Sequence, residues 1–252
     1  MEEYSNKFIL SSANLIDLLC YPRFSASDYY SRLSELRSLN LKFVILEGNT
    51  LLNAIRILGK GSEGLVLKVQ NIHSKTMALK IKRIDSCRTD MKNEFEFYQS
   101  INRNNLGPKV YSYTKNALLM EFIEGLSARN WFLKSKMNLD LVRKIIINIL
   151  TQCYTLDKLH IDHGQLNKLD NHVIISHCGS KCTIVDFESA SCIRKVNNVT
   201  SAFQGLIFKG IISDQINKFV NYDKKRVEFL NLLSSYKMDK SKKNFDSIIA
   251  LI

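Results

Sequence analysis

The sequence predicts an α+β protein in which a strand-rich part is followed by a mainly helical part. Three observations favour this fold class. Residues 58–82 have the pattern of a strand, a glycine-containing turn and a second strand. Residues 138–160 carry the strongest helical pattern, with apolar side chains at intervals of three and four. Two short apolar strands, 173–176 and 183–185, then end in the carboxylate of Asp186.

Composition excludes several classes of protein. A hydrophobic share of 45% in 252 residues is typical of a folded globular chain and excludes intrinsic disorder. Lys and Arg number 36 against 24 Asp and Glu, and the resulting net charge of +12 favours acidic partners such as nucleotides, RNA or acidic protein segments, or serves solubility alone. The start lacks a basic signal sequence, and no apolar run reaches the roughly 18 residues of a membrane span. We therefore expect a cytoplasmic protein without membrane contact.

The six cysteines are expected to be thiols, because disulfides are rare in cytosolic proteins. His177, Cys178 and Cys182 have a spacing that suits part of a zinc site. The residues between the two cysteines, Gly-Ser-Lys, also suit a turn that joins two strands, and we favour the turn.

Residues 1–52 are predicted to stand apart from residues 53–252. They contain a short apolar helix at 14–20, a helix capped by Ser25 or Ser27 that runs to Leu39, a strand at 42–46 and a turn at 47–49. Two interpretations remain open: a small appended domain of the winged-helix kind, or an extension packed on the rest of the chain. We favour the extension.

The hairpin at 58–82 has the features of a phosphate-binding element. Glycines at 59, 61 and 64 allow backbone N–H groups to approach phosphate oxygens closely. Strand alternation puts Ala78 and Lys80 on one face and Met77, Leu79 and Ile81 on the other. A small residue that leaves room for an adenine ring therefore lies beside a lysine that can reach phosphates.

A helix over 90–101, capped by Asp90, is predicted next. Helical spacing places Glu94 with Met91, Tyr98 and Ile101 on the inward face, whereas Glu96 falls on the outward face. Glu94 is the expected partner of Lys80; a solvated glutamate is the alternative. Strands at 110–113 and 117–122 and a small helix at 128–133 follow.

Five segments resemble protein kinases in their order along the chain: G-x-G-x-x-G-x-V, A-x-K, M-E-F-I-E-G, H-G-Q-L and D-F-E. Over residues 55–210 the chain is similar to RIO kinases and to the small atypical kinase of the KEOPS complex. D-F-E-S-A-S together with H-G-Q-L resembles a group of archaeal predicted serine/threonine kinases.

The resemblance implies a two-lobed protein-kinase-like α+β fold. Residues 53–124 would form an N-lobe with a five-stranded antiparallel sheet, and residues 125–252 a reduced helical C-lobe, because A-P-E is absent and the stretch after Asp186 is short. That stretch is predicted to hold a helix capped by Thr200 that runs to Phe208, one from Asp223 to about Tyr236, and one at 244–252.

The same resemblance implies that ATP and Mg²⁺ bind in the cleft between the lobes. The implied nucleotide contacts, the last two through the backbone, come from Gly59, Lys60, Gly61, Gly64, Val66, Ala78, Lys80, Met120, Glu121 and Ile123. The implied metal ligands are Asp186 and Asn171, and the implied catalytic residues are Asp170, Lys80, Glu94 and Gln165.

The loop at 163–175 departs from the kinase pattern. Gln165 occupies the position of the catalytic aspartate and cannot accept a proton as a carboxylate does. Asp170 stands where the metal-binding asparagine is expected. Either an insertion makes Asn171 or His172 the residue next to the metal, or Asp170 itself holds it. Asp162 or Asp170 would then replace the missing base.

The leading functional prediction is therefore an atypical kinase that phosphorylates serine or threonine of a protein, or itself. The alternatives are a nucleotide-binding pseudokinase adaptor, a small-molecule phosphotransferase of the choline or aminoglycoside kinase type and, last, a basic RNA-binding module. The basic residues of the C-terminal helices are either a docking face for RNA, ribonucleoprotein or acidic protein, or a solvated surface. They are Lys224, Lys225, Arg226, Lys237, Lys240, Lys242 and Lys243.

Overall fold

The computed structural model describes residues 7–10 and 15–252, so Asn14 of the first predicted helix lies outside the described residues. The chain divides into two units. Unit 1 consists of Met1–Arg103 and Pro108–Ile123, and unit 2 of Asn104–Gly107 and Glu124–Ile252. Within the described residues, no helix is both long and apolar enough to cross a membrane.

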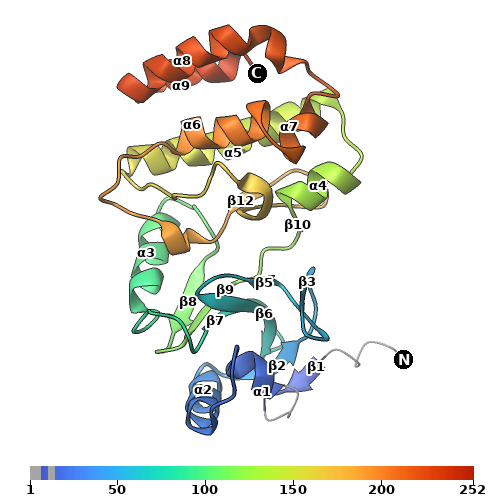
Figure 1. The fold of residues 1–252 in the computed structure, drawn as a ribbon, viewed down its shortest axis with the longest axis vertical. Coiled ribbons are helices and arrows are strands. Elements are labelled where there is room, and N and C mark those ends of the chain that lie inside the picture. Colours follow the sequence, from blue (N-terminus) through green and yellow to red (C-terminus); the bar gives the residue numbers. More distant parts are fainter. Residues whose placement is uncertain (1–6, 11–14) are drawn as a thin grey trace. The chain divides into compact units, whose positions relative to one another are not determined.

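Unit 1 is built on an antiparallel sheet of seven strands with the order β1-β2-β6-β7-β9-β8, in which β5 also pairs with β6 (Figure 1). A separate hairpin pairs β3 with β4. The elements of unit 1 are β1 (Lys7–Ile9), α1 (Ile16–Leu19), α2 (Ala26–Ser38), β2 (Leu41–Ile45), β3 (Thr50–Leu52), β4 (Ile55–Ile57), β5 (Gly59–Lys60), β6 (Gly64–Asn71), β7 (Thr76–Lys82), α3 (Lys92–Asn102), β8 (Val110–Tyr113) and β9 (Ala117–Glu121).

Five strands of this sheet, β5, β6, β7, β8 and β9, come from residues 53–124 as predicted, and β1 and β2 of the N-terminal segment extend it to seven. The eight residues of β6 pair along one edge with β7. On the other edge, β5 covers only Val66 and Leu65, and β2 pairs with Lys68 to Asn71. An unpaired stretch of β6 would expose backbone N–H and C=O groups, and β2 covers that stretch.

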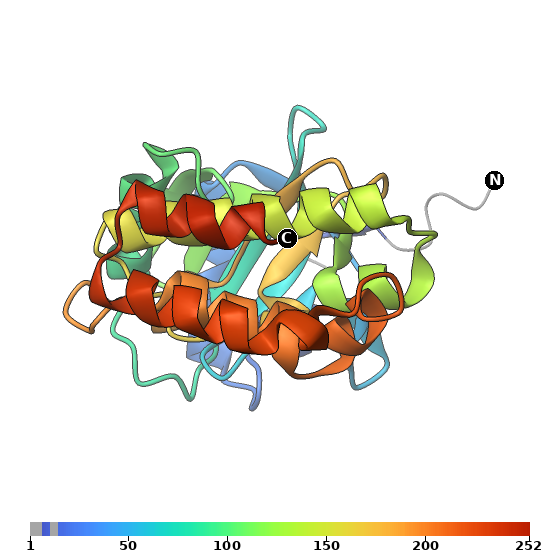
Figure 2. The ribbon, with the colours of Figure 1, turned by 90° about the horizontal axis from the view of Figure 1, so that it is seen from above.

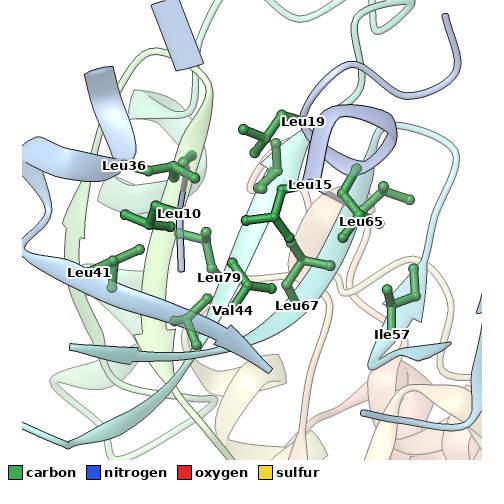
Figure 3. Close-up of a cluster of buried hydrophobic side chains, with 14 of the residues drawn as sticks. Leu10, Leu15, Leu19, Leu36, Leu41, Val44, Ile57, Leu65, Leu67 and Leu79 are labelled. Atoms are coloured by element: carbon green, nitrogen blue, oxygen red, sulfur yellow. The ribbon is translucent and has the colours of Figure 1, made fainter. Parts of the chain in front are cut away.

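One face of this sheet and the N-terminal helices share a single hydrophobic core. The sheet contributes Leu65, Leu67, Leu79 and others at every second position, and α1 and α2 contribute Leu18, Leu19, Leu33 and Leu36 (Figure 3). The predicted domain boundary at residue 52 stays a prediction. The hydrophobic core contains residues from both sides of that boundary.

Unit 2 is mainly helical, with a small sheet of order β10-β11-β12. Its elements are β10 (Leu126–Ser127), α4 (Ala128–Lys134), α5 (Leu139–Lys158), η2 (Leu169–Asn171), β11 (Val173–Ile175), β12 (Cys182–Ile184), η3 (Phe187–Ser189), α6 (Asn198–Phe203), η4 (Gln204–Phe208), α7 (Ile211–Ile216), η5 (Tyr222–Lys225), α8 (Arg226–Met238) and α9 (Lys242–Ala250).

Aromatic contacts hold the helices of unit 2 in two layers. Tyr154 of α5 stacks on Phe245 of α9 with 4.5 Å between ring centroids. Phe203 of α6 packs on Phe229 of α8 at 4.8 Å. The pair α8 and α9 therefore covers the pair α6 and α5, as Figures 1 and 2 show.

Three helices, α3, α6 and α9, begin at other residues than the sequence predicted. Asp90 accepts a hydrogen bond from the Lys92 N–H at 3.0 Å, so α3 begins two residues after Asp90. Thr200 lies inside α6 and donates its hydroxyl to the Asn197 carbonyl at 3.0 Å, so it is not a cap. Ser241 caps α9, which begins before the predicted start at residue 244. The sequence pattern gave no sign of α7.

A buried carboxylate joins three helices of unit 2. Asp157 of α5 is 1% exposed and accepts hydrogen bonds from the Asn198 N–H at 2.9 Å, the Asn198 side-chain amide at 2.8 Å and the Val199 N–H at 3.3 Å. The Tyr236 hydroxyl of α8 donates to it at 3.0 Å. Burial raises the pKa of Asp157, and these hydrogen bonds oppose the rise.

Asn198 connects the buried Asp157 to the loop after α5 through hydrogen bonds. Its side-chain oxygen accepts the His163 N–H at 2.9 Å, and its amide also donates to the Ile161 carbonyl. The start of α6 and the start of the loop are therefore positioned by the same buried group.

We predict that Asp157→Ala lowers the free energy of unfolding by about 3 kcal/mol or more, because several buried donors lose their acceptor. Tyr236→Phe removes one donor only and should cost roughly 1–2 kcal/mol. Urea unfolding at pH 7 measures both. Equal losses in the two variants would show that Asp157 is not the centre of the network.

Candidate active site

In unit 1, the sheet face opposite the hydrophobic core brings together predicted nucleotide contacts. Lys80 on β7 is paired with Val66 on β6 and with Leu118 on β9. Ala78, two residues earlier, is paired with Met120. Because paired residues of antiparallel strands point to the same side, Val66, Ala78, Lys80 and Met120 share one face.

The ammonium of Lys80 is buried and paired with a carboxylate. Its Nζ lies 2.7 Å from Glu94 Oε1, and the two residues are 5% and 7% exposed. The other oxygen of Glu94 accepts a hydrogen bond from Arg88 at 2.6 Å. Glu96 lies on the exposed side of α3, 3.7 Å from Lys92. Glu94 is therefore the carboxylate of α3 that reaches Lys80.

Arg88 was missed by sequence reasoning. It lies in the irregular segment between β7 and α3, where no periodic pattern indicates which way a side chain points. Its contact gives Glu94 two cationic neighbours. Lys80 and Arg88 thus share the Glu94 carboxylate.

The glycine turn is closed by backbone hydrogen bonds from the Gly61 N–H to the Gly64 carbonyl at 2.8 Å and from the Arg83 N–H to the Glu63 carbonyl at 2.9 Å. Gly64 is required by close approach, because a Cβ there would lie 3.0 Å from the Ile81 carbonyl oxygen and 3.3 Å from Lys80 Cε. A Cβ at Gly59 would meet nothing nearer than 3.9 Å. Lys60 extends over the ring of Tyr21, 4.9 Å from its centroid.

The predicted adenine-binding segment begins where β9 ends. The Glu121 N–H donates to the Lys109 carbonyl at 2.7 Å, and its carboxylate accepts the Lys109 N–H at 3.1 Å. Strand pairing stops at Glu121, so the backbone of Ile123 lies outside the ladder. The roles of the Glu121 carbonyl and the Ile123 amide in binding adenine stay predictions.

In unit 2, His163 anchors the loop that follows α5. It is fully buried, its ring packs on Phe187 at 4.8 Å, and its Nε2 lies 3.1 Å from the Val185 carbonyl. Burial lowers the pKa of His163 to about 4, so the ring is neutral at pH 7. A neutral ring with its proton on Nε2 donates to Val185.

Asp186 follows β12 in a left-handed backbone conformation, with φ of 64° and ψ of 67°. This region is costly for a residue with a Cβ, although aspartate tolerates it better than most. Strained residues of this kind cluster at functional sites. Its side chain is 41% exposed.

The hairpin of β11 and β12 places His172 beside Asp186. Val173 is paired with Ile184, and the Val185 N–H donates to the His172 carbonyl at 2.9 Å. His172 Nδ1 lies 3.8 Å from Asp186 Oδ2. Burial lowers the pKa of His172, against the opposing effects of Asp186, Asp170 and Glu188.

The remaining candidate residues in and next to this loop are Asp162, Gln165, Asp170 and Asn171. Asp170 lies 3.5 Å from Arg129 of α4, and Asp162 lies 2.8 Å from Arg194. Asn171 is exposed on η2, and Gln165 is half-buried. Both carboxylates that could replace the missing base are therefore paired with arginine.

Among the described residues, no group of three or more His, Cys, Asp and Glu side chains could hold a metal ion. Cys178 and Cys182 lie at the turn between β11 and β12 and at the start of β12, and both are free. Asp186 and His172 thus offer two protein ligands, and any ion there would take further ligands from phosphate or water.

We predict that the wild type loses about 3 kcal/mol more stability between pH 7 and pH 4 than a His163→Phe variant. The folded pKa near 4 lies below the ordinary 6.5, so the unfolded chain binds the proton more readily. The His163 contribution is present above pH 6.5 and is lost as the pH falls toward 4. Urea unfolding across this range measures it, and His177→Phe, at an exposed position, should leave the pH dependence unchanged.

Comparison with known proteins gives a family. A profile described as RIO domain matches residues 66–203, more than half of the chain. No curated protein matches the sequence.

Among solved structures, the Rio2 kinase in an ADP/Mg²⁺-phosphoaspartate complex from Chaetomium thermophilum is similar in fold. It has a TM-score of 0.50 and 16% identity, over 91% of this chain and 76% of that one. The autoinhibited serine kinase domain of titin matches with a TM-score of 0.44 and 17% identity, over 54% of this chain and 44% of that one. Because the RIO domain profile covers more than half of the chain, the chain belongs to the RIO domain family, and its likeness to the Rio2 kinase shows the protein-kinase-like fold.

Proposed function

We propose that the chain is an ATP- and Mg²⁺-dependent atypical serine/threonine protein kinase that transfers the γ-phosphate to a protein hydroxyl or to itself. The observation that carries this proposal is the buried pair of Lys80 and Glu94 at 2.7 Å, on the sheet face next to the glycine turn. A lysine held in this way has one fixed position, as a ligand of the α- and β-phosphates requires.

Asp186 and His172 fit a divalent ion in this proposal. Mg²⁺ is bound in nucleotide sites by one or two carboxylates, with phosphate oxygens and water completing its coordination. The carboxylate of Asp186 supplies one such ligand, and the buried Nδ1 of His172 lies beside it without a hydrogen-bond partner in the described part of the chain. The ion would neutralise phosphate charge during transfer. The Rio2 structure, which is a complex with ADP and Mg²⁺, supports a nucleotide and Mg²⁺ as the groups bound.

Transfer without an aspartate at position 165 is chemically reasonable, because phosphoryl transfer depends mainly on positioning and charge neutralisation. Of the two nearby carboxylates, Asp170 is the better acceptor for the hydroxyl proton. Its side chain is 34% exposed and lies 3.5 Å from Arg129, whereas that of Asp162 is 14% exposed and lies 2.8 Å from Arg194. Asp170 is therefore less firmly held.

A second candidate is a pseudokinase that binds nucleotide without transferring phosphate. It is favoured by Gln165 and by the arginine partners of both replacement carboxylates. The acceptor class also remains a proposal: a protein hydroxyl is favoured over a small molecule by membership of the RIO family. RNA contact through α8 and α9, and a cytoplasmic location, remain predictions, as does the archaeal grouping.

We predict that Lys80→Met weakens ATP binding about tenfold or more, because phosphate loses its buried cation; a factor of ten corresponds to about 1.4 kcal/mol. Lys92→Met, on the exposed side of α3, is the control and should leave the dissociation constant unchanged. Calorimetric titration with a non-hydrolysable ATP analogue and Mg²⁺ measures both. Equal affinities in wild type and Lys80→Met would contradict the assignment of the phosphate site.

The neighbouring carboxylates give a matched pair of variants. Glu94→Gln should destabilise the fold by about 3 kcal/mol, because two cations lose their shared carboxylate. Glu96→Gln should change stability by no more than about 0.5 kcal/mol, since surface pairs contribute little.

Transfer itself is tested by incubation with γ-labelled ATP and Mg²⁺, with a generic protein acceptor present. We expect label in protein, and a loss of about 100-fold in rate in Asp170→Asn, the size typical for removing a proton acceptor. Asp223→Asn, at an exposed position, is the control. ATP binding without any labelling would select the pseudokinase, and labelling of choline- or sugar-like acceptors alone would select a small-molecule enzyme.

A further inference from the structure

The position next to Asp186 is occupied by a histidine. In the β11–β12 hairpin, Val173 is paired with Ile184, so the residue just before β11 lies beside the residues just after β12. That residue is His172, and its carbonyl accepts the Val185 N–H at 2.9 Å. The register thus sets His172 opposite Val185, and the side chain of His172 reaches the neighbouring Asp186, with Nδ1 3.8 Å from Oδ2.

The ring of His172 has an unsatisfied atom. Nδ1 is buried and has no hydrogen-bond partner in residues 7–10 and 15–252. It faces the Asp186 carboxylate at 3.8 Å, which is too long for a hydrogen bond. Buried polar atoms are nearly always satisfied, so an orphan of this kind calls for a missing partner.

A divalent ion would give Nδ1 of His172 a partner and could be bound by the Asp186 carboxylate at the same time. Nitrogen and oxygen ligands lie about 2.1 Å from such an ion, so two of them are separated by at most about 4.2 Å. The separation of 3.8 Å between Nδ1 and Oδ2 falls within this limit. The alternatives are less suitable, because Asn171 is exposed and Asp170 lies beside Arg129.

We propose that His172 Nδ1 and the Asp186 carboxylate together bind the divalent ion of the nucleotide site, and that this site prefers a first-row transition ion such as Mn²⁺ to Mg²⁺. Mg²⁺ prefers oxygen ligands, whereas an imidazole nitrogen favours transition ions. This inference rests on the proposed nucleotide site and adds the identity of one ligand and the choice of metal.

The test compares ADP binding with Mn²⁺ and with Mg²⁺ in the full chain. The ratio of the two dissociation constants is measured in wild type, in His172→Asn, which offers an oxygen ligand, and in the matched control His177→Asn at an exposed position. We expect the wild type and His177→Asn to favour Mn²⁺, and His172→Asn to reduce that preference about tenfold, the loss typical of a perturbed metal site.

A spectroscopic readout on the wild type needs no variant. Pulsed electron paramagnetic resonance of bound Mn²⁺ with ADP should show the coupling of a directly bound imidazole ¹⁴N. Absence of this coupling, or an equal metal preference in wild type and His172→Asn, would overturn the inference but leave the nucleotide site intact. If neither ion supported ADP binding to the wild type, both this inference and the proposed function would fail.

Discussion

A lysine ammonium buried in a sheet is stable only beside a negative charge, and much of unit 1 is arranged around this constraint. Burying an isolated cation costs several kcal/mol, whereas a close carboxylate offsets that cost. Glu94 supplies the carboxylate, so α3 must pack with its Glu94 face toward β7. A Cβ at Gly64 would crowd the same lysine, 3.3 Å from its Cε. Arg88 then adds a second cation to the cluster.

The opposite face of the sheet explains why the N-terminal segment folds as it does. Because side chains alternate along a strand, one face of the sheet carries Lys80 and the other face is apolar. The apolar face must be shielded from water by other elements. Helices α1 and α2 shield it with leucines, and β2 pairs with the stretch of β6 that β5 does not reach (Figure 3). Arg32 of α2 links these layers, because its guanidinium donates to the carbonyls of Leu19 and Lys82.

Unit 2 uses buried hydrogen bonds for a similar purpose. Asp157, Asn198 and the His163 N–H form a continuous chain from α5 to the loop that precedes β11. Each group in this chain is satisfied by the next, which makes the arrangement specific as well as stable. The hairpin of β11 and β12 then sets His172 opposite Val185, and the side chain of His172 lies 3.8 Å from that of Asp186.

Local patterns in the sequence were sufficient for the glycine hairpin, the shared face of Ala78 and Lys80, the inward face of Glu94 and the strand that ends at Asp186, because alternation and helical spacing depend only on near neighbours. The seven-stranded sheet, Arg88 and the buried Asp157 network were decided by tertiary structure. They depend on edges, charges and donors from distant segments, as the 41-residue separation of Asp157 and Asn198 illustrates. The choice between Asp170, Asn171 and His172 was of the same kind, because it needs the three-dimensional contact between the side chains of His172 and Asp186, which no local pattern shows.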